Sequence, residues 1–119
     1  MKRVKLLMTV AAALVVATSG NAHPNPNAYD TSVQIEIKGK VVMFKLQNPH
    51  SLLYVDVSNP DGSITHWVVE GGAGSELAKS GLTREFLATK PNVIVTAHQS
   101  IDKSCDPTCR AGGVKFVFE

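Results

Sequence analysis

The sequence predicts an all-β domain with one short helical segment, arranged as an OB-fold-like five-stranded Greek-key barrel. Apolar and polar residues alternate with a period of two over 33–38, and further β-type segments follow between turn residues. The strand-type alternation of apolar residues gives way to a helical pattern only once, in the stretch 75–88. The resulting order is bent strand, strand, strand, helix, strand, strand, which is that of an OB-fold. A small open β-sandwich is the alternative.

The first predicted strand is long and bent. Its alternating apolar residues are followed by Gly39, after which the β-type composition resumes over 41–46. A glycine inside a long strand often marks a bulge or a sharp bend. We expect a bend here because the first strand of such a barrel serves both halves of the sheet.

The remaining elements are bounded by turn residues. Further strands are predicted at 52–57, 64–70, 93–97 and 114–118. Ser75 can cap a short helix that ends before Gly81, and Thr83 can cap a second helical turn. The stretch 99–113 is rich in Ser, Asp, Gly and Cys, so it is predicted to be a loop.

The start of the chain has the three parts of a cleavable signal peptide. A basic segment at 2–5 precedes an apolar stretch at 6–18, and the small residues Gly20 and Ala22 suit a cleavage site. The apolar stretch is shorter than the roughly 20 residues that span a bilayer. An uncleaved membrane anchor is the alternative. We expect a periplasmic or secreted protein with a signal peptide over 1–22, an extended arm over 23–31 and an OB-like barrel over 32–119.

Charge and motifs argue against two classes of function. The chain has 12 Lys+Arg and 10 Asp+Glu, but three of the basic residues lie in the predicted signal peptide. The mature side chains therefore sum to −1, and no basic cluster remains that would bind nucleic acid. The sequence contains no Gly-x-Ser-x-Gly, His-Glu-x-x-His or phosphate-loop motif, so we do not expect an enzyme.

The two cysteines form a closely spaced pair. Cys105 and Cys109 enclose Asp106-Pro107, which can reverse the chain and bring them together. In an oxidising compartment such a pair forms a disulfide. The alternative is a reduced pair that binds a soft metal such as Cu(I).

Two loops and one face are the candidate binding regions. Ligands of an OB-fold meet the outer face of its second and third strands, framed by two loops. The first loop contains His50, and the second follows His98 and holds both cysteines, so we expect the two loops to meet at one rim. Tyr54 is predicted on the ligand face. His66 joins it if its neighbour Trp67 points into the barrel.

Copper is the cofactor that the histidines suggest. Cleavage after Ala22 would give His23 a free amine beside its imidazole, and both are good ligands for Cu(II). Pro24 has no N–H, which excludes a chelate through its amide nitrogen. A site with His23, His50 and His98 remains a hypothesis. The alternative is that these histidines have three separate structural roles.

Four motifs occur in the order of a known family: Asn48-Pro-His-Ser, Trp67-x-x-Glu-Gly-Gly, Leu77-Ala-x-x-Gly-x-Thr-Arg and Val93-x-Val-Thr-x-His. Over residues 32–100 the chain resembles a family of short exported bacterial proteins of unknown function. Its members read N-P-H, W-x-x-E, G-W-T-R-D and V-T-V-x-G-H-P. Leu82 replaces the usual tryptophan, and the cysteine loop is an addition. The resemblance implies export but no activity. Glu70 and Arg84, which belong to two motifs, are candidates for an ion pair.

Two functions from different classes follow from these observations. The first is an exported, non-catalytic binding module that uses the barrel rim on a protein or cell-envelope partner. The second is a periplasmic copper-binding protein that uses the mature N-terminal histidine and the rim histidines. A purely structural accessory role is a third reading.

Overall fold

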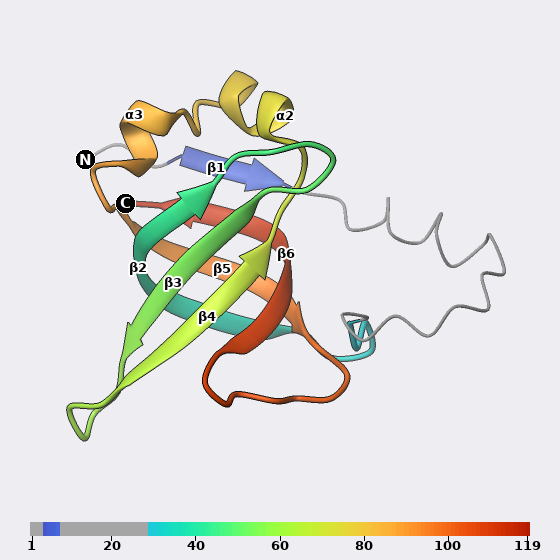
Figure 1. The fold of residues 1–119 in the computed structure, drawn as a ribbon, viewed down its shortest axis with the longest axis vertical. Helices are drawn as coiled ribbons and strands as arrows, with labels where there is room; N and C mark the ends of the chain where they lie inside the picture. Colours follow the sequence, from blue (N-terminus) through green and yellow to red (C-terminus); the bar gives the residue numbers. More distant parts are fainter. Residues whose placement is uncertain (1–3, 8–28) are drawn as a thin grey trace, which may run out of the picture.

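One sheet that closes on itself forms the body of the protein. The computed structural model describes residues 4–7 and 29–119 (Figure 1). The barrel strands are β2 (Ile35–Lys45), β3 (Leu52–Ser58), β4 (Ile64–Glu70), β5 (Asn92–Gln99) and β6 (Cys109–Phe118). Two short helices, α2 (Gly74–Lys79) and α3 (Arg84–Leu87), lie between β4 and β5. The predicted OB-fold-like barrel is therefore confirmed.

The last strand closes the barrel. β6 pairs antiparallel with β5 along most of its length and parallel with the end of β4, where Trp67 lies opposite Cys109. A further strand, β1 (Val4–Leu7), pairs antiparallel with the end of β6, with Val4 opposite Phe118. No helix in the described ranges, 4–7 and 29–119, is long and apolar enough to cross a membrane.

The bend in β2 occurs where the sequence predicts it. Residues before Gly39 pair with β5, and Lys40 is the first residue that pairs with β3. A Cβ at Gly39 would overlap the carbonyl oxygen of Asp56, so the two strands cross closely only because the side chain is absent. A register shift between Val41 and Met43 adds a bulge just after the bend.

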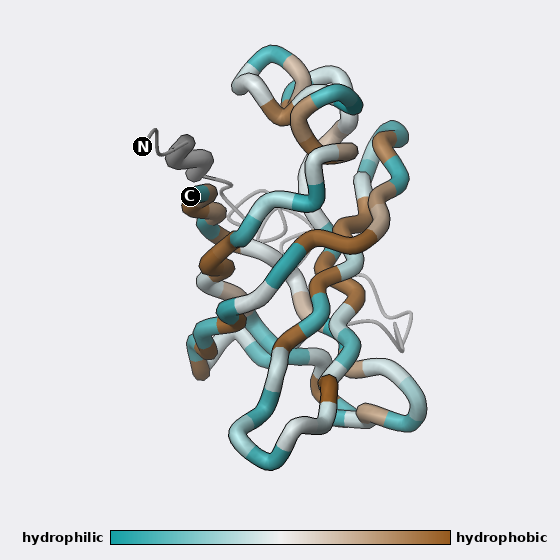
Figure 2. Tube along the Cα trace, turned by 90° about the vertical axis from the view of Figure 1, so that its left-hand side faces the viewer, coloured by the Kyte–Doolittle hydropathy of each residue, from teal (hydrophilic) through white to brown (hydrophobic). Residues whose placement is uncertain are grey.

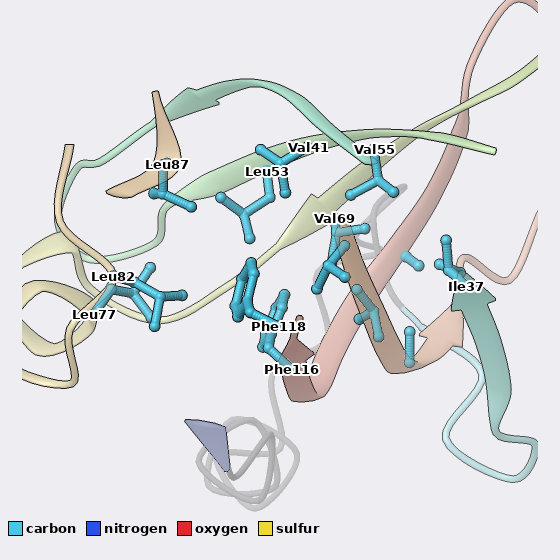
Figure 3. Packing of buried hydrophobic residues seen from close by; sticks show 14 residues of the cluster. Ile37, Val41, Leu53, Val55, Val69, Leu77, Leu82, Leu87, Phe116 and Phe118 are labelled. Atoms are coloured by element: carbon cyan, nitrogen blue, oxygen red, sulfur yellow. The ribbon is translucent and has the colours of Figure 1, made fainter. Parts of the chain in front are cut away.

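The core fills the barrel and extends under the helices. Aliphatic side chains from all five barrel strands meet two stacked phenylalanines of β6, Phe116 and Phe118, whose ring centroids lie 6.4 Å apart (Figure 3). Leu77, Leu82 and Leu87 bring the helical segment onto the same cluster. Polar and apolar residues alternate along much of the strands (Figure 2), and in β3 this gives one buried and one outward face.

The helical segment differs from the prediction at one cap. α2 begins at Gly74, one residue before Ser75, and its N-cap Ala73 makes no side-chain bond. The amide of Gly74 instead donates to the carbonyl of Gln47 at 2.9 Å, so a loop replaces the expected cap. Gly81 has φ +96° just after α2, and Thr83 accepts a hydrogen bond from an amide of α3, as predicted.

The predicted loop over 99–113 is wrong at its second half. β6 begins at Cys109, so only the shorter stretch between β5 and β6 is a loop. Gly112 and Gly113 lie within the strand because neighbouring rings occupy the space of a side chain. A Cβ at Gly113 would overlap the ring of Phe116. Their glycine-rich composition reflects close packing in a strand rather than a turn.

We predict that Gly39→Ala destabilises the protein. The added methyl meets the backbone of β3 rather than a mobile side chain, so the bend must open or the strands must separate. The expected loss in the free energy of unfolding is about 1–3 kcal/mol, measured by urea denaturation. Lys38→Ala, at an exposed neighbour on the same strand, is the control and should change stability by less than about 0.5 kcal/mol. Equal stability of the two variants would contradict the role given to Gly39.

Candidate functional site

Three rows of side chains cross the outer surface of β2, β3 and β4, and we call this surface the outer face. Cross-strand pairing forms the middle row from Met43, Tyr54, Val68 and, on β6, Arg110. A second row contains Lys45, Leu52 and Glu70. A third row contains Lys40, Asp56 and His66. The residues that alternate with these on β3 and β4 include Val55 and Val69, which are fully buried, so the rows point away from the core.

The outer face is apolar at its centre and charged around it. Leu52, Tyr54 and Val68 are half-buried by their neighbours, and Met43 is 47 % exposed. Helices α2 and α3 lie at one end of the barrel, whereas β3 and β4 cross its front (Figure 1). The two helices therefore leave this face uncovered.

Glu70 joins the outer face to the Asn48-Pro49-His50 loop and to the N-terminal arm. Its Oε1 accepts a short hydrogen bond from the hydroxyl of Tyr29, and its Oε2 lies 3.7 Å from Nδ1 of His50. The same Nδ1 lies 3.3 Å from the carbonyl oxygen of Gly71, which accepts its proton. The side chain of His50 is 60 % exposed. Two of the motifs noted in the sequence, Asn48-Pro49-His50 and the one that ends at Glu70, thus meet in space.

Tyr29 is seated on β6. A Cβ at Gly112 would lie 3.0 Å from the Tyr29 ring, so the glycine provides a flat place for it. Tyr29 also forms an antiparallel bridge with Ser100, and the next amide, of Asp30, donates to the carbonyl of Gln99 at 2.9 Å. Burial raises the pKa of the Tyr29 phenol, and the hydrogen bond and negative charge of Glu70 raise it further. The arm is therefore fixed to the barrel from Tyr29 onward.

The other two described histidines each have an oxygen partner. His66 is exposed, as predicted, and its Nδ1 lies 2.7 Å from Oδ1 of Asp56 on the outer face. His98 is only 8 % exposed, and its Nδ1 donates to the carbonyl of Val33 at 2.8 Å. Trp67 packs against the core, consistent with the opposite orientation of His66.

Of the predicted copper ligands, His50 and His98 lie in the described residues and are not neighbours. His98 pairs with Gly112, and Gly112 pairs with Glu70, the partner of His50. Two strand spacings, about 10 Å, therefore separate the backbones of His98 and Glu70. His23 lies outside the described residues. Among residues 29–119, no group of three or more His, Cys, Asp or Glu is placed to hold a metal ion.

The two loops do not meet at one rim. The loop between β2 and β3 lies at the end of the barrel near α2, whereas the loop between β5 and β6 lies at the opposite end (Figure 1). The latter holds the predicted disulfide, with Cys105 and Cys109 sulfurs 2.00 Å apart. The expectation of a common rim is wrong because β6 begins early and runs parallel to β4 from Cys109. His50 instead faces the end of β4.

A shallow hollow of about 360 Å³ lies between the β2–β3 loop and the helical segment. Asn48, Ser75, Thr83, Arg84 and Glu85 are among the residues that line it. Two of the motifs noted in the sequence therefore border the hollow. The expected ion pair of Glu70 with Arg84 is wrong, because Glu70 turns toward Tyr29 and His50 instead.

Sequence reasoning missed two residues of the site. Tyr29 falls in a segment rich in Pro and Asn that predicts only an extended arm, and Arg110 falls in the stretch that was predicted to be a loop. The signal that was available is the pair Gly112-Gly113. Two adjacent glycines near an aromatic-rich strand indicate close packing as well as a turn.

One comparison with known proteins decides the family. A model described as a family of unknown function, DUF6152, matches residues 11–108. The chain belongs to DUF6152. No curated protein and no solved structure gives a significant match.

The DUF6152 match covers most of the candidate site. Tyr29, His50, Tyr54, His66 and Glu70 lie inside the matched range, whereas Arg110 and the seat of Tyr29 on β6 lie beyond its end. The resemblance seen in the sequence is thus confirmed as membership of a family of unknown function.

We predict that Tyr29 ionises later than an ordinary tyrosine. In a Tyr54→Phe variant, Tyr29 is the single remaining phenol, and its near-ultraviolet phenolate absorbance should rise only above pH 10.0. Because the folded-state pKa is raised, the associated stability is present below pH 10 and is lost as pH rises from the unfolded pKa toward the folded one. Adding Glu70→Gln should lower the midpoint, since it removes the carboxylate charge. A midpoint near 10 in both proteins would show that Tyr29 is not seated as described.

Proposed function

We propose that this DUF6152 protein is an exported, non-catalytic binding module that receives a protein or cell-envelope partner on its outer face. The observation that carries the proposal is the middle row: Tyr54 and Val68 form a half-buried apolar centre that α2 and α3 leave uncovered. The equivalent face of an OB-fold, over its second and third strands, is where such barrels meet their ligands.

Export is supported by the start of the chain and by the disulfide. Residues 1–22 have the three parts of a signal peptide, and the Cys105–Cys109 bond suits an oxidising compartment. A periplasmic or secreted protein with a mature side-chain charge of −1 and no basic cluster also suits a partner other than nucleic acid.

A binding role fits the shape of the outer face better than catalysis does. Its two acidic side chains already have partners, and the histidine on it pairs with Asp56 on an open strand surface. Catalysis commonly uses a concave site that excludes water. The hollow near α2 is the described pocket closest to that form, but Tyr54 and His66 do not line it.

The proposal predicts crosslinking from one face only. A photoreactive phenylalanine analogue at Tyr54 should give one adduct of defined size when the protein is recovered from the periplasm, because the partner rests on that ring. The same analogue at Ala88, an exposed residue at the end of α3, is the control and should give none. Intact mass of the uncrosslinked protein should correspond to a chain that starts at His23. Absence of an adduct, or the same adducts from both positions, would overturn the proposal.

Copper binding is a second candidate, favoured by the anchoring of Tyr29. The arm is fixed at Glu70, and His50 lies on the other oxygen of that carboxylate. Six residue steps lead from His23 to Tyr29 and can reach at most about 20 Å, so a mature N-terminal His23 can meet the exposed ring of His50. The Nδ1 proton of His50 bonds to a carbonyl, as in many metal-binding histidines, and this leaves Nε2 as the ligand atom.

This candidate predicts that Cu(II) affinity depends on the processed terminus. Protein that begins at His23 should bind Cu(II) at least about tenfold more tightly than a variant with one extra N-terminal residue, because the extension separates the amine from the His23 ring. His50→Ala should cause a similar loss, and affinity should fall at acidic pH because protons compete with the metal for the imidazole nitrogens. His66→Ala is the matched control and should bind normally. Equal binding by all forms, measured by calorimetric titration, would eliminate the site.

A further inference from the structure

The two carboxylates of the outer face already have side-chain partners. Asp56 lies 2.7 Å from Nδ1 of His66, and both residues belong to the third row. Glu70 accepts the hydroxyl proton of Tyr29 and lies 3.7 Å from Nδ1 of His50. Neither carboxylate is therefore free to meet a cationic ligand without losing a partner that it has.

The basic groups of the same face are free. Lys40, Lys45 and Arg110 are exposed, and none of them takes part in an ion pair with another residue of the range 29–119. With histidine counted as neutral, these three cations against the two carboxylates give the face a formal charge of +1, although the mature chain carries −1 overall. This contrast points to an anionic ligand for this surface.

The free cations lie on opposite sides of the apolar centre. Lys45 belongs to β2, Arg110 belongs to β6, and β3 and β4 lie between them. Three strand spacings combined with the offset of one row, two residues along the strands, correspond to about 16 Å between their backbones. Leu52, Tyr54 and Val68 occupy the intervening strands. A fitting ligand therefore has two negative groups on opposite sides of an apolar group.

An extended peptide provides this order of groups at a similar spacing. Its residues advance about 3.3–3.4 Å each, so positions i and i+4 lie about 13 Å apart on one side, with position i+2 between them on the same side. We propose that the partner presents an extended segment with Asp or Glu at i and i+4 and an apolar residue at i+2, laid across β2, β3 and β4. This inference rests on the proposed function and names the chemistry of its partner.

A membrane surface fits these observations less well. Of the four apolar side chains on the face, only Met43 is strongly exposed, so little apolar surface can enter a bilayer. Three cations attract an anionic surface by about 1 kcal/mol each, whatever the spacing of its charges. The cations lie on both sides of an apolar row. This arrangement favours a ligand whose negative groups are likewise separated by an apolar group.

Two peptides of identical composition test the spacing. The probe contains Glu-Thr-Leu-Thr-Glu between neutral flanks, and its isomer contains Thr-Glu-Glu-Leu-Thr in the same flanks. The processed full protein should bind the probe about tenfold more tightly than the isomer, measured by calorimetry. Amide shifts in a magnetic resonance titration should move at Tyr54, Val68 and Arg110. Equal affinity for both peptides would overturn the proposal, as would binding of anionic phosphatidylglycerol vesicles without binding of the probe.

Charge reversal tests the cations. The double variant Lys45→Glu, Arg110→Glu should bind the probe at least about tenfold more weakly. It should instead bind a Lys-Thr-Leu-Thr-Lys analogue, and this binding also shows that the variant is folded. Lys79→Glu with Lys90→Glu makes the same change in net charge away from the face, so probe binding should stay within about twofold. An unchanged affinity in the first variant would overturn the proposal.

The crosslinking experiment separates this inference from the proposed function. If Tyr54 gives an adduct in both the unchanged protein and the Lys45→Glu, Arg110→Glu variant, the outer face binds a partner but not an acidic one, so only this inference fails. If Tyr54 gives no adduct in the unchanged protein, the proposed function fails. Loss of the adduct in the charge-reversed variant alone supports both.

Discussion

The fold depends on β2 pairing with two different strands. Its first half pairs with β5 and its second half with β3, and the close crossing at Gly39 allows one strand to do both. β6 then completes the circuit between β4 and β5. Closure removes the unpaired central edges that an open sheet would expose, and it also sets which side chains face outward.

The pairing register of the strands determines which side chains line up on the outer face. Because side chains alternate along a strand, residues that pair across four strands must share one face. Met43, Tyr54, Val68 and Arg110 come from separate parts of the chain, yet they stand in one line. The acids beside that line are held by Tyr29, His50 and His66, so the line has cations free at its edges.

The order of elements was predictable because it depends on local sequence patterns. Alternation marked the strands, Gly39 marked the bend, and Thr83 and Gly81 marked helix ends. The site was only half predictable. Tyr54 and His66 follow from strand parity, but the contacts of Glu70 with Tyr29 and His50 join residues 41 and 20 positions apart. Spacing along the chain carries no information about such contacts. The glycine-rich composition at the start of β6 also predicted a loop rather than a strand.

The seat of Tyr29 has a consequence for the order of folding. Its ring lies on Gly112, so the arm rests on the last strand of the chain. Contacts of such long sequence separation form late, after the chain entropy of a nearly complete loop has been lost. During synthesis Tyr29 has no place to dock until Gly112 has been made. We therefore expect the anchoring of the arm to be among the last contacts of the domain to form.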